Sequence, residues 1–190
     1  MCFKVRKKLQ DLGFGDFFSV EDPHGWNKSR IEILDRTMFE KEINDWENRI
    51  RSCENGKKLR TYKLFKHSFD IEKYVTCNIA KKYRSAFAKF RCGVAPLRIE
   101  TGRYENLHVN DRKCVHCIDD IEDEVHVFTK CPLYSELREI LYENAVRLNR
   151  DFNILNDQEK FTFMFESDDM CSIVAKTCHS ILLRRNSFFI

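Results

Sequence analysis

Hydrophobic residues recur along this chain at spacings of three and four, which are typical of amphipathic helices. One stripe lies among charged residues, and we expect it to pack in a core; it consists of Phe39, Ile43, Trp46 and Ile50. A second apolar face runs between Asp70, a suitable N-cap, and Gly93, a suitable residue to follow a helix end. That face comprises Val75, Ile79, Tyr83, Ala86, Phe87 and Phe90. The pattern therefore predicts two long helices in the first half of the chain.

Three further helices are predicted in the second half. The first follows Pro132, which suits an initial helical turn, and has Leu137, Ile140, Leu141 and Leu148 on its inner face. Asn156 and Asp157 can cap a short helix that carries Phe161, Met164 and Phe165. Asp168 or Asp169 can cap the last helix, in which Val174, Ile181 and Leu182 face the core.

Shorter elements complete the predicted architecture. The opening stretch up to Gly25 predicts a short helix and then irregular chain, and a basic helix is expected over residues 57–67. Alternation of Leu97, Ile99 and Thr101 with polar residues indicates a short strand before Gly102. We expect a mostly α-helical fold with at most a short β-hairpin. Its segments are 1–56 (helical), 57–110 (basic helix and strand), 111–135 (metal-binding) and 136–190 (helical), forming one compact domain.

Composition supports a soluble protein with a genuine core. The chain has 190 residues, of which 43% are hydrophobic and 13% aromatic. It contains no apolar run of about 20 residues, so we expect no membrane partner, and no signal-like apolar region follows the basic N-terminus. Nine cysteines, an odd number, then indicate reduced thiols in an intracellular setting, nuclear or cytoplasmic.

Charge is distributed unevenly along the chain. The formal net charge is +3, but residues 51–113 carry a net +10, against −1 before them and −6 after them. A basic middle segment points to a polyanion such as RNA or DNA as partner, but charge alone favours a solvated helix surface. The residues that we expect to contact nucleic acid are Lys58, Arg60, Lys63, Lys66, Lys73, Lys81, Arg84 and Arg91.

The strongest chemical motif is Cys-x2-Cys-x8-His-x4-Cys, formed by Cys114, Cys117, His126 and Cys131. Zinc binds four such ligands in a tetrahedron, with thiolate sulfur at about 2.3 Å. Because four protein ligands leave no position for water, the pattern predicts a structural Zn²⁺ that staples the loop. His116 is a rival ligand, although its place between the two cysteines would strain their turn. The acidic residues of 119–124 should repel phosphate from this loop.

No catalytic constellation is evident, and we expect no enzymatic activity from this chain. The Asp168–Asp169 pair resembles the paired aspartates of a polymerase palm, but that chemistry needs a third carboxylate from a distant strand. Cys171 or Cys178 with His179 could suggest a cysteine hydrolase. However, Cys178 and His179 are neighbours that point to different helix faces, and buried thiols are the ordinary interpretation.

Several segments together resemble the zinc-binding region at the C-terminal end of reverse transcriptases from non-LTR (LINE-like) retrotransposons. The metal region contributes Arg-Lys-Cys-Val-His-Cys, Ile-Glu-Asp-Glu-Val-His and Cys-Pro-Leu-Tyr-Ser-Glu-Leu-Arg. The other similar segments are residues 11–15, 58–66, 90–92, 97–104 and 161–165. The resemblance covers most of the chain, whereas the endonuclease and polymerase domains of such proteins do not fit within it.

The resemblance implies a non-catalytic module that helps a polymerase to hold template RNA or target DNA. The polymerase domain of a parent retroelement protein would then be a further partner. The alternative that we carry forward is a structural or protein-interaction remnant of a retroelement with no nucleic-acid role. A contiguous basic face over residues 57–91 would favour the first hypothesis, and interleaving of those cations with Asp and Glu would favour the second.

Overall fold

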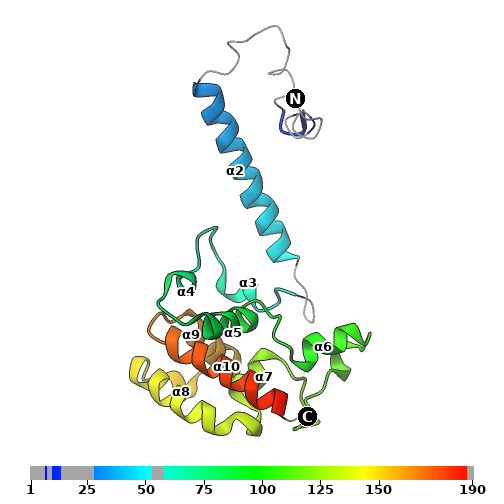
Figure 1. Ribbon diagram of the computed structural model, residues 1–190, viewed down its shortest axis with the longest axis vertical. Coiled ribbons are helices and arrows are strands. Elements are labelled where there is room, and N and C mark those ends of the chain that lie inside the picture. The colour runs from blue at the N-terminus through cyan, green and yellow to red at the C-terminus, as the bar shows by residue number, and fades with distance from the viewer. Residues whose placement is uncertain (1–6, 8–9, 14–27, 53–57, 188–190) are drawn as a thin grey trace. The chain divides into compact units, whose positions relative to one another are not determined.

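The computed structural model describes residues 7, 10–13, 28–52 and 58–187 (Figure 1). The chain divides into two units, residues 1–51 and residues 52–190, where we expected one compact domain. The second unit contains the basic, metal-binding and C-terminal segments together. The predicted opening helix, with the irregular chain up to Gly25, falls almost wholly outside the described residues, as does the helix end expected at residues 54–56.

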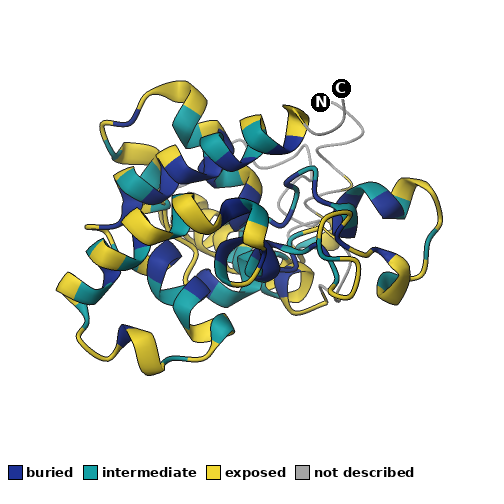
Figure 2. Cartoon of the chain, turned by 90° about the horizontal axis from the view of Figure 1, so that it is seen from below, coloured by how far each residue is buried: buried dark blue, intermediate teal, exposed yellow. Residues whose placement is uncertain are grey.

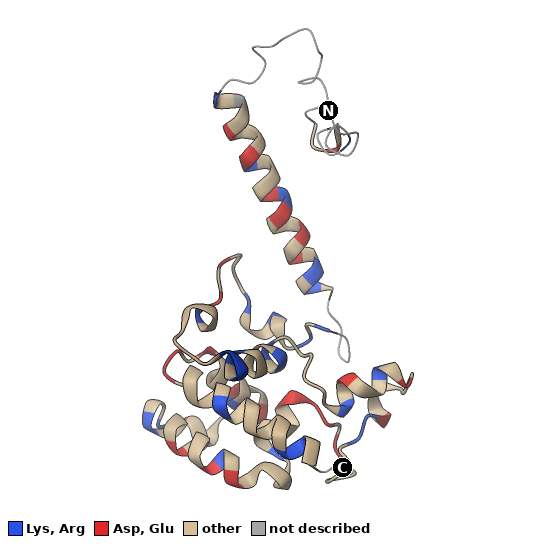
Figure 3. Ribbon diagram, in the orientation of Figure 1, with Lys and Arg blue, Asp and Glu red and all other residues tan. Residues whose placement is uncertain are grey.

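Helix α2 (Lys28–Arg51) is the main described element of the first unit. Its predicted apolar stripe does not form a buried core along its whole length, since Phe39 is 54% exposed whereas Ile50 is 7% exposed. Residues of both charge signs are distributed along the helix (Figure 3). Two pairs at i, i+4 spacing link Lys28 to Glu32 and Arg51 to Glu47, an arrangement that stabilises an exposed helix by a few tenths of a kcal/mol each.

The second unit is built from helices, which confirms the predicted fold class. Its helices are α3 (Tyr62–Phe65), α4 (Lys73–Thr76), α5 (Lys81–Arg91), α6 (Arg98–Tyr104), α7 (Glu124–Thr129), α8 (Ser135–Leu148), α9 (Asp157–Glu166) and α10 (Cys171–Ser187). Short 3-10 turns lie at Val109–Asp111, Pro132–Tyr134 and Phe152–Ile154. Within the described residues, β structure is limited to one antiparallel bridge between Lys113 and Ile121.

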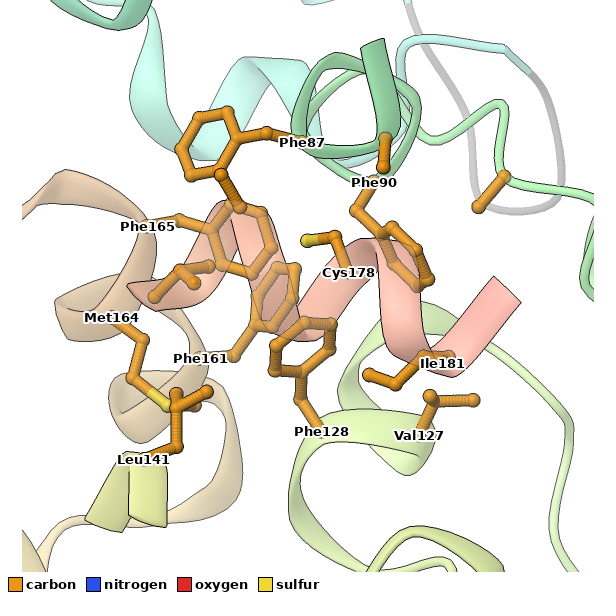
Figure 4. Packing of buried hydrophobic residues seen from close by; sticks show 14 of the residues in the cluster. Phe87, Phe90, Val127, Phe128, Leu141, Phe161, Met164, Phe165, Cys178 and Ile181 are labelled. Carbon is orange, nitrogen blue, oxygen red and sulfur yellow. The ribbon is translucent and has the colours of Figure 1, made fainter. Parts of the chain in front are cut away.

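Phenylalanine side chains form the centre of this unit (Figure 4). Helix α10 packs against α5, α8 and α9, and the rings of Phe128, Phe161 and Phe165 lie beside its Cys178. Phe161 has its ring centroid 4.5 Å from that of Phe165 and 5.7 Å from those of Phe65 and Phe128. Each fully buried Phe contributes about 2 to 3 kcal/mol through burial. The longer helices therefore each present one buried side and one exposed side (Figure 2).

The strand predicted around residues 97–101 is wrong, because this segment enters helix α6. Leu97 is the extended residue before the helix, and it is fully buried, as Ile99 nearly is. Glu100 is also buried, although the alternating pattern placed it in solvent, because Arg60 and Arg103 pair with its carboxylate. A five-residue alternation is short enough to fit a helix start that is buried on several sides.

The helix predicted from Asp70 to Phe90 is interrupted, so that prediction is also wrong in its extent. The structure has two helices, α4 and α5, separated by four residues, and the α5 N-cap is Ala80. Arg84 donates to the Cys77 carbonyl at 2.8 Å, which also accepts from the Ile79 amide, and to the Ile79 carbonyl at 3.1 Å, so these carbonyls of the interruption have partners. The predicted end is confirmed: Gly93 has φ +64°, and a Cβ there would lie 2.8 Å from Cγ of Arg60.

The C-terminal helices agree more closely with the sequence pattern. Asn156 caps α9 through a capping box with Glu159, as its position predicts. The inner face predicted for α8 is correct at Leu141, which is buried, but wrong at Ile140 and Leu148, which are 59% and 48% exposed. The Asp168 carboxylate accepts from Lys73 at 2.6 Å rather than from an α10 backbone amide.

Candidate metal centre and charged surfaces

The first two cysteines of the metal motif lie in a tight turn closed by the bridge between Lys113 and Ile121. The Cys114 amide donates to the Asp120 carbonyl at 2.8 Å. In return, the Ile118 amide donates to the Cys114 carbonyl at 2.8 Å, and the Asp119 amide donates to the Cys117 carbonyl at 2.7 Å. These bonds fold the chain back on itself, so that both thiols point to one side of the turn. This single bridge is consistent with the expectation of at most a short β-hairpin.

Ile118 closes this turn in a backbone conformation that is unfavourable for its residue type. Its φ is +67°, in the left-handed region that a β-branched residue rarely adopts. Its side chain is also 71% exposed, so packing does not stabilise it. The conformation follows from the need to reverse the chain directly after Cys117.

The second pair of ligands is positioned by helix α7 and the turn after it. Asp123 caps α7 by accepting from the His126 amide at 2.8 Å. At the other end, the His126 carbonyl accepts from the Cys131 amide at 2.9 Å, which fixes the four-residue spacing of the motif. Arg138 of α8 donates to the Cys131 carbonyl at 2.5 Å. Backbone bonds thus hold His126 and Cys131 on one side of this turn.

The four ligand atoms come together as the sequence spacing predicts. One ligand atom from each of Cys114, Cys117, His126 and Cys131 lies within 4.8 Å of all the others. Sγ of Cys131 is 3.9 Å from Sγ of Cys114 and 3.7 Å from Sγ of Cys117. Two thiolates on one tetrahedral Zn²⁺, each at about 2.3 Å, are about 3.8 Å apart. The cluster therefore fits a metal ion, and the exposed rival His116 lies outside it.

The environment of the cluster suits a cation. Neither ring nitrogen of the buried His126 has a hydrogen bond to any described residue, although Oδ2 of Asp120 lies 3.4 Å from Nδ1. Burial raises the pKa of the Cys117 and Cys131 thiols and lowers the pKa of the His126 imidazole. These groups are thus neutral in the absence of a cation, and binding of a metal would release protons from the thiols.

Only some of the acidic residues in the metal loop (residues 112–131) face solvent. This corrects our argument that all the acidic residues of 119–124 repel phosphate. Glu122 is 2% exposed, and its carboxylate accepts two hydrogen bonds of 2.9 Å from the Arg185 guanidinium of α10. Glu124 is 1% exposed and accepts from Arg60 at 2.5 and 3.1 Å. These two carboxylates anchor the loop to distant parts of the chain. The exposed negative charge of the loop comes from Asp119 and Asp120.

The basic residues predicted to contact nucleic acid are dispersed. Three of them, Arg60, Lys66 and Arg91, are buried and form ion pairs with Glu100, Glu124 or Glu72. Others are exposed or half-buried: Lys73 is exposed but pairs with Asp168, Arg84 is half-buried against backbone carbonyls, Lys63 is half-buried, and Lys58 and Lys81 are exposed. The predicted set therefore does not form one contiguous surface.

Two neighbouring helices carry exposed lysines, of which the sequence argument named Lys81 and missed the others. Helices α5 and α10 pack together, and neither contains an Asp or a Glu. Within the part of the chain that the structure describes, four exposed lysines on these helices make no ion pair; they are Lys81, Lys82, Lys89 and Lys176, here termed the α5–α10 lysines. The acid-free stretches of residues 81–91 and 171–187 were the available sequence signal.

Cys178, His179 and Asp168 were considered as catalytic candidates, and each is buried in the core or paired with another side chain. The Cys178 thiol is fully buried in the core, and burial raises its pKa well above the ordinary value. The His179 ring packs against Tyr83, and the Asp168 carboxylate pairs with Lys73.

None of the described helices combines the length and the apolar character that crossing a bilayer requires.

Fold and site together define a helical domain with a candidate Cys3His metal centre. Nothing matches this chain in comparisons with protein-family models, with curated proteins and with solved structures.

Proposed function

We propose that this chain is a non-catalytic, zinc-stabilised nucleic-acid-binding domain in which the α5–α10 lysines contact the phosphate backbone. The observation that carries the proposal is the pair of packed helices with no acidic residue and with four exposed lysines. Nucleic acids bind such surfaces because each neutralised phosphate releases condensed counterions. As the resemblance implies, the domain would support template RNA or target DNA binding beside a retroelement polymerase.

Zinc is the metal that best suits the candidate centre. Three sulfurs and one imidazole at tetrahedral spacing are the donor set of structural zinc sites. With Asp120 close to Nδ1 of His126, the other ring nitrogen, Nε2, would face the metal, since a carboxylate commonly orients a ligating imidazole in this way. Bound Zn²⁺ would cross-link the loop without an open position for substrate. The role proposed for it is therefore stability.

A second candidate function, a structural or protein-interaction remnant of a retroelement, is favoured by a different observation. Three of the eight residues predicted to contact nucleic acid, Arg60, Lys66 and Arg91, are buried against glutamates. Their charges are neutralised by buried ion pairs, so these residues stabilise the fold and do not contact a ligand. The two candidates differ in whether the α5–α10 lysines bind a polyanion.

Charge reversal on α5 tests the proposal. Lys81→Glu with Lys82→Glu places acids in the first helical turn, which the helix dipole favours, so the fold should remain stable. We expect weaker RNA and DNA binding in fluorescence polarisation, and a salt slope of log K lower in magnitude by about 1.4 to 1.8.

The control is the double variant Arg36→Glu, Lys41→Glu, which makes the same charge change at exposed positions of α2 in the other unit. It should bind like the unmodified protein. If both double variants lose affinity equally, only net charge matters and the assigned surface is wrong. If the unmodified protein binds neither RNA nor DNA at 50 mM salt, the remnant hypothesis replaces the proposal.

A further inference from the structure

An aromatic pair lies where α5 and α10 meet, close to two of the α5–α10 lysines, Lys82 and Lys176. The ring of Tyr83 on α5 and the ring of His179 on α10 have centroids 5.3 Å apart at an angle of 75°. Both side chains are half-buried, so part of each remains accessible. Nζ of Lys82 is held 4.8 Å from the centroid of the Tyr83 ring. Lys176 is one helical turn before His179 on α10.

Tyr83 packs partly against the core, so only the solvent-facing part of this pair can meet a ligand. In an edge-on contact the edge of one ring meets the face of the other, and the ring that supplies the edge keeps both of its faces clear of its partner. A planar base is the natural ligand for an accessible ring face, and a nearby ammonium group suits the phosphate of the same nucleotide. The combination of aromatic rings with unpaired lysines is the chemistry of a single-strand binding surface.

We infer that the ligand of this surface is single-stranded nucleic acid, with one base stacked on the Tyr83–His179 pair and adjacent phosphates on the α5–α10 lysines. The inference rests on the proposed function and narrows it. Duplexes keep their bases stacked on each other, so they would contact the lysines alone. Because every base has a π face, the surface should accept many sequences. An acidic peptide would likewise use only the lysines.

Another exposed aromatic residue provides a contrast within the same unit. Tyr104 on α6 is 69% exposed, and the Arg103 guanidinium lies 4.9 Å from its ring centroid. The arginines of α6, however, pair with carboxylates: Arg103 with Glu100 and Arg98 with Glu105. A phosphate would meet neutralised charge there. Tyr104 is therefore a matched control for loss of an accessible tyrosine ring without loss of the proposed site.

The test compares Tyr83→Leu, Tyr83→Phe and Tyr104→Leu in the full chain. Each is titrated with a 12-nucleotide single-stranded RNA that contains one 2-aminopurine, with the duplex form of the same RNA, and with poly-glutamate. Leucine keeps an apolar side chain of high helix propensity at position 83, and circular dichroism checks the fold of each variant.

We expect Tyr83→Leu to weaken single-strand binding by about 5- to 150-fold, the range for loss of one base–aromatic stack, and to abolish 2-aminopurine quenching. Its duplex affinity and its salt slope should be unchanged, because the phosphate contacts remain. Tyr83→Phe, which keeps the ring, and Tyr104→Leu should both match the unmodified protein.

Two results would overturn the inference. One is equal loss of single-strand and duplex binding in Tyr83→Leu, and the other is unaltered quenching in that variant. Competition by poly-glutamate as strong as that by single-stranded RNA of equal charge would instead identify an acidic protein segment as the ligand. The α5 charge reversal separates these outcomes from failure of the proposed function, because only that variant reports on the phosphate contacts.

Discussion

The metal loop (residues 112–131) and the phenylalanine core of the second unit are stabilised by different physical means. The core buries a cluster of rings from α3, α5, α7 and α9 against α10, so its stability comes from apolar surface removed from water. The loop adds Val127 and Phe128 of α7 to that core, but it also brings together four potential metal ligands and two buried glutamates. A core of this kind tolerates local change, whereas the loop depends on a few specific bonds.

Removal of the metal should have the largest effect, because it should destabilise the metal loop and leave the core folded. Structural zinc sites in small domains are worth about 10 to 16 kcal/mol in apparent binding free energy. We therefore expect chelation, or Cys117→Ser, to abolish amide-exchange protection over residues 112–131 while α10 stays protected. Hydrogen exchange with mass spectrometry, together with elemental analysis for zinc, measures both effects. A purified protein without stoichiometric zinc would refute the zinc assignment. Equal loss of amide-exchange protection in the loop and in the core would show that the core also depends on the metal.

Breaking the ion pair that links the metal loop to the core should have the next largest effect on the free energy of unfolding. Glu122 joins the loop to Arg185 of α10 through two buried hydrogen bonds. Glu122→Leu would leave the Arg185 guanidinium buried without its carboxylate, at a cost of about 3 to 5 kcal/mol. Adding Arg185→Met should recover much of that loss, although the Arg98 amide would still lack its Glu122 acceptor. Urea unfolding of the single and double variants provides the measurement, and additive losses would mean that the pair is not coupled.

The smallest effect is expected at the strained turn of the metal loop. Ile118 occupies the left-handed region with φ +67° and is exposed, so Ile118→Gly removes strain without removing packing. The gain should be about 1 kcal/mol, and it should appear in the loop more than in the core. Thermal unfolding and the metal dissociation constant report the two contributions. Ile118→Val, which remains β-branched, is the control and should show no gain.

Local patterns in the sequence predicted those features that depend on residues close together along the chain. The metal ligands lie within 18 positions, so one tight turn and one short helix bring them together whatever the rest of the fold does. The α9 capping box and the glycine after α5 are equally local. The strand predicted near residue 99 failed because its five-residue pattern is too short to distinguish a strand from a helix start buried on several sides.

Counting charges located a basic segment but could not say which of its charges meet solvent. Arg60 pairs with Glu124 across 64 positions, and Arg185 pairs with Glu122 across 63. Sequence alone does not reveal such partners, because ion pairing depends on distance in space and burial decides which cations stay hydrated. The sequence by itself therefore determined the helical class and the ligand set of the metal loop. Only the tertiary structure decided that Arg60, Lys66 and Arg91 are buried in ion pairs, and that Lys81, Lys82, Lys89 and Lys176 are exposed with no ion pair to a described residue.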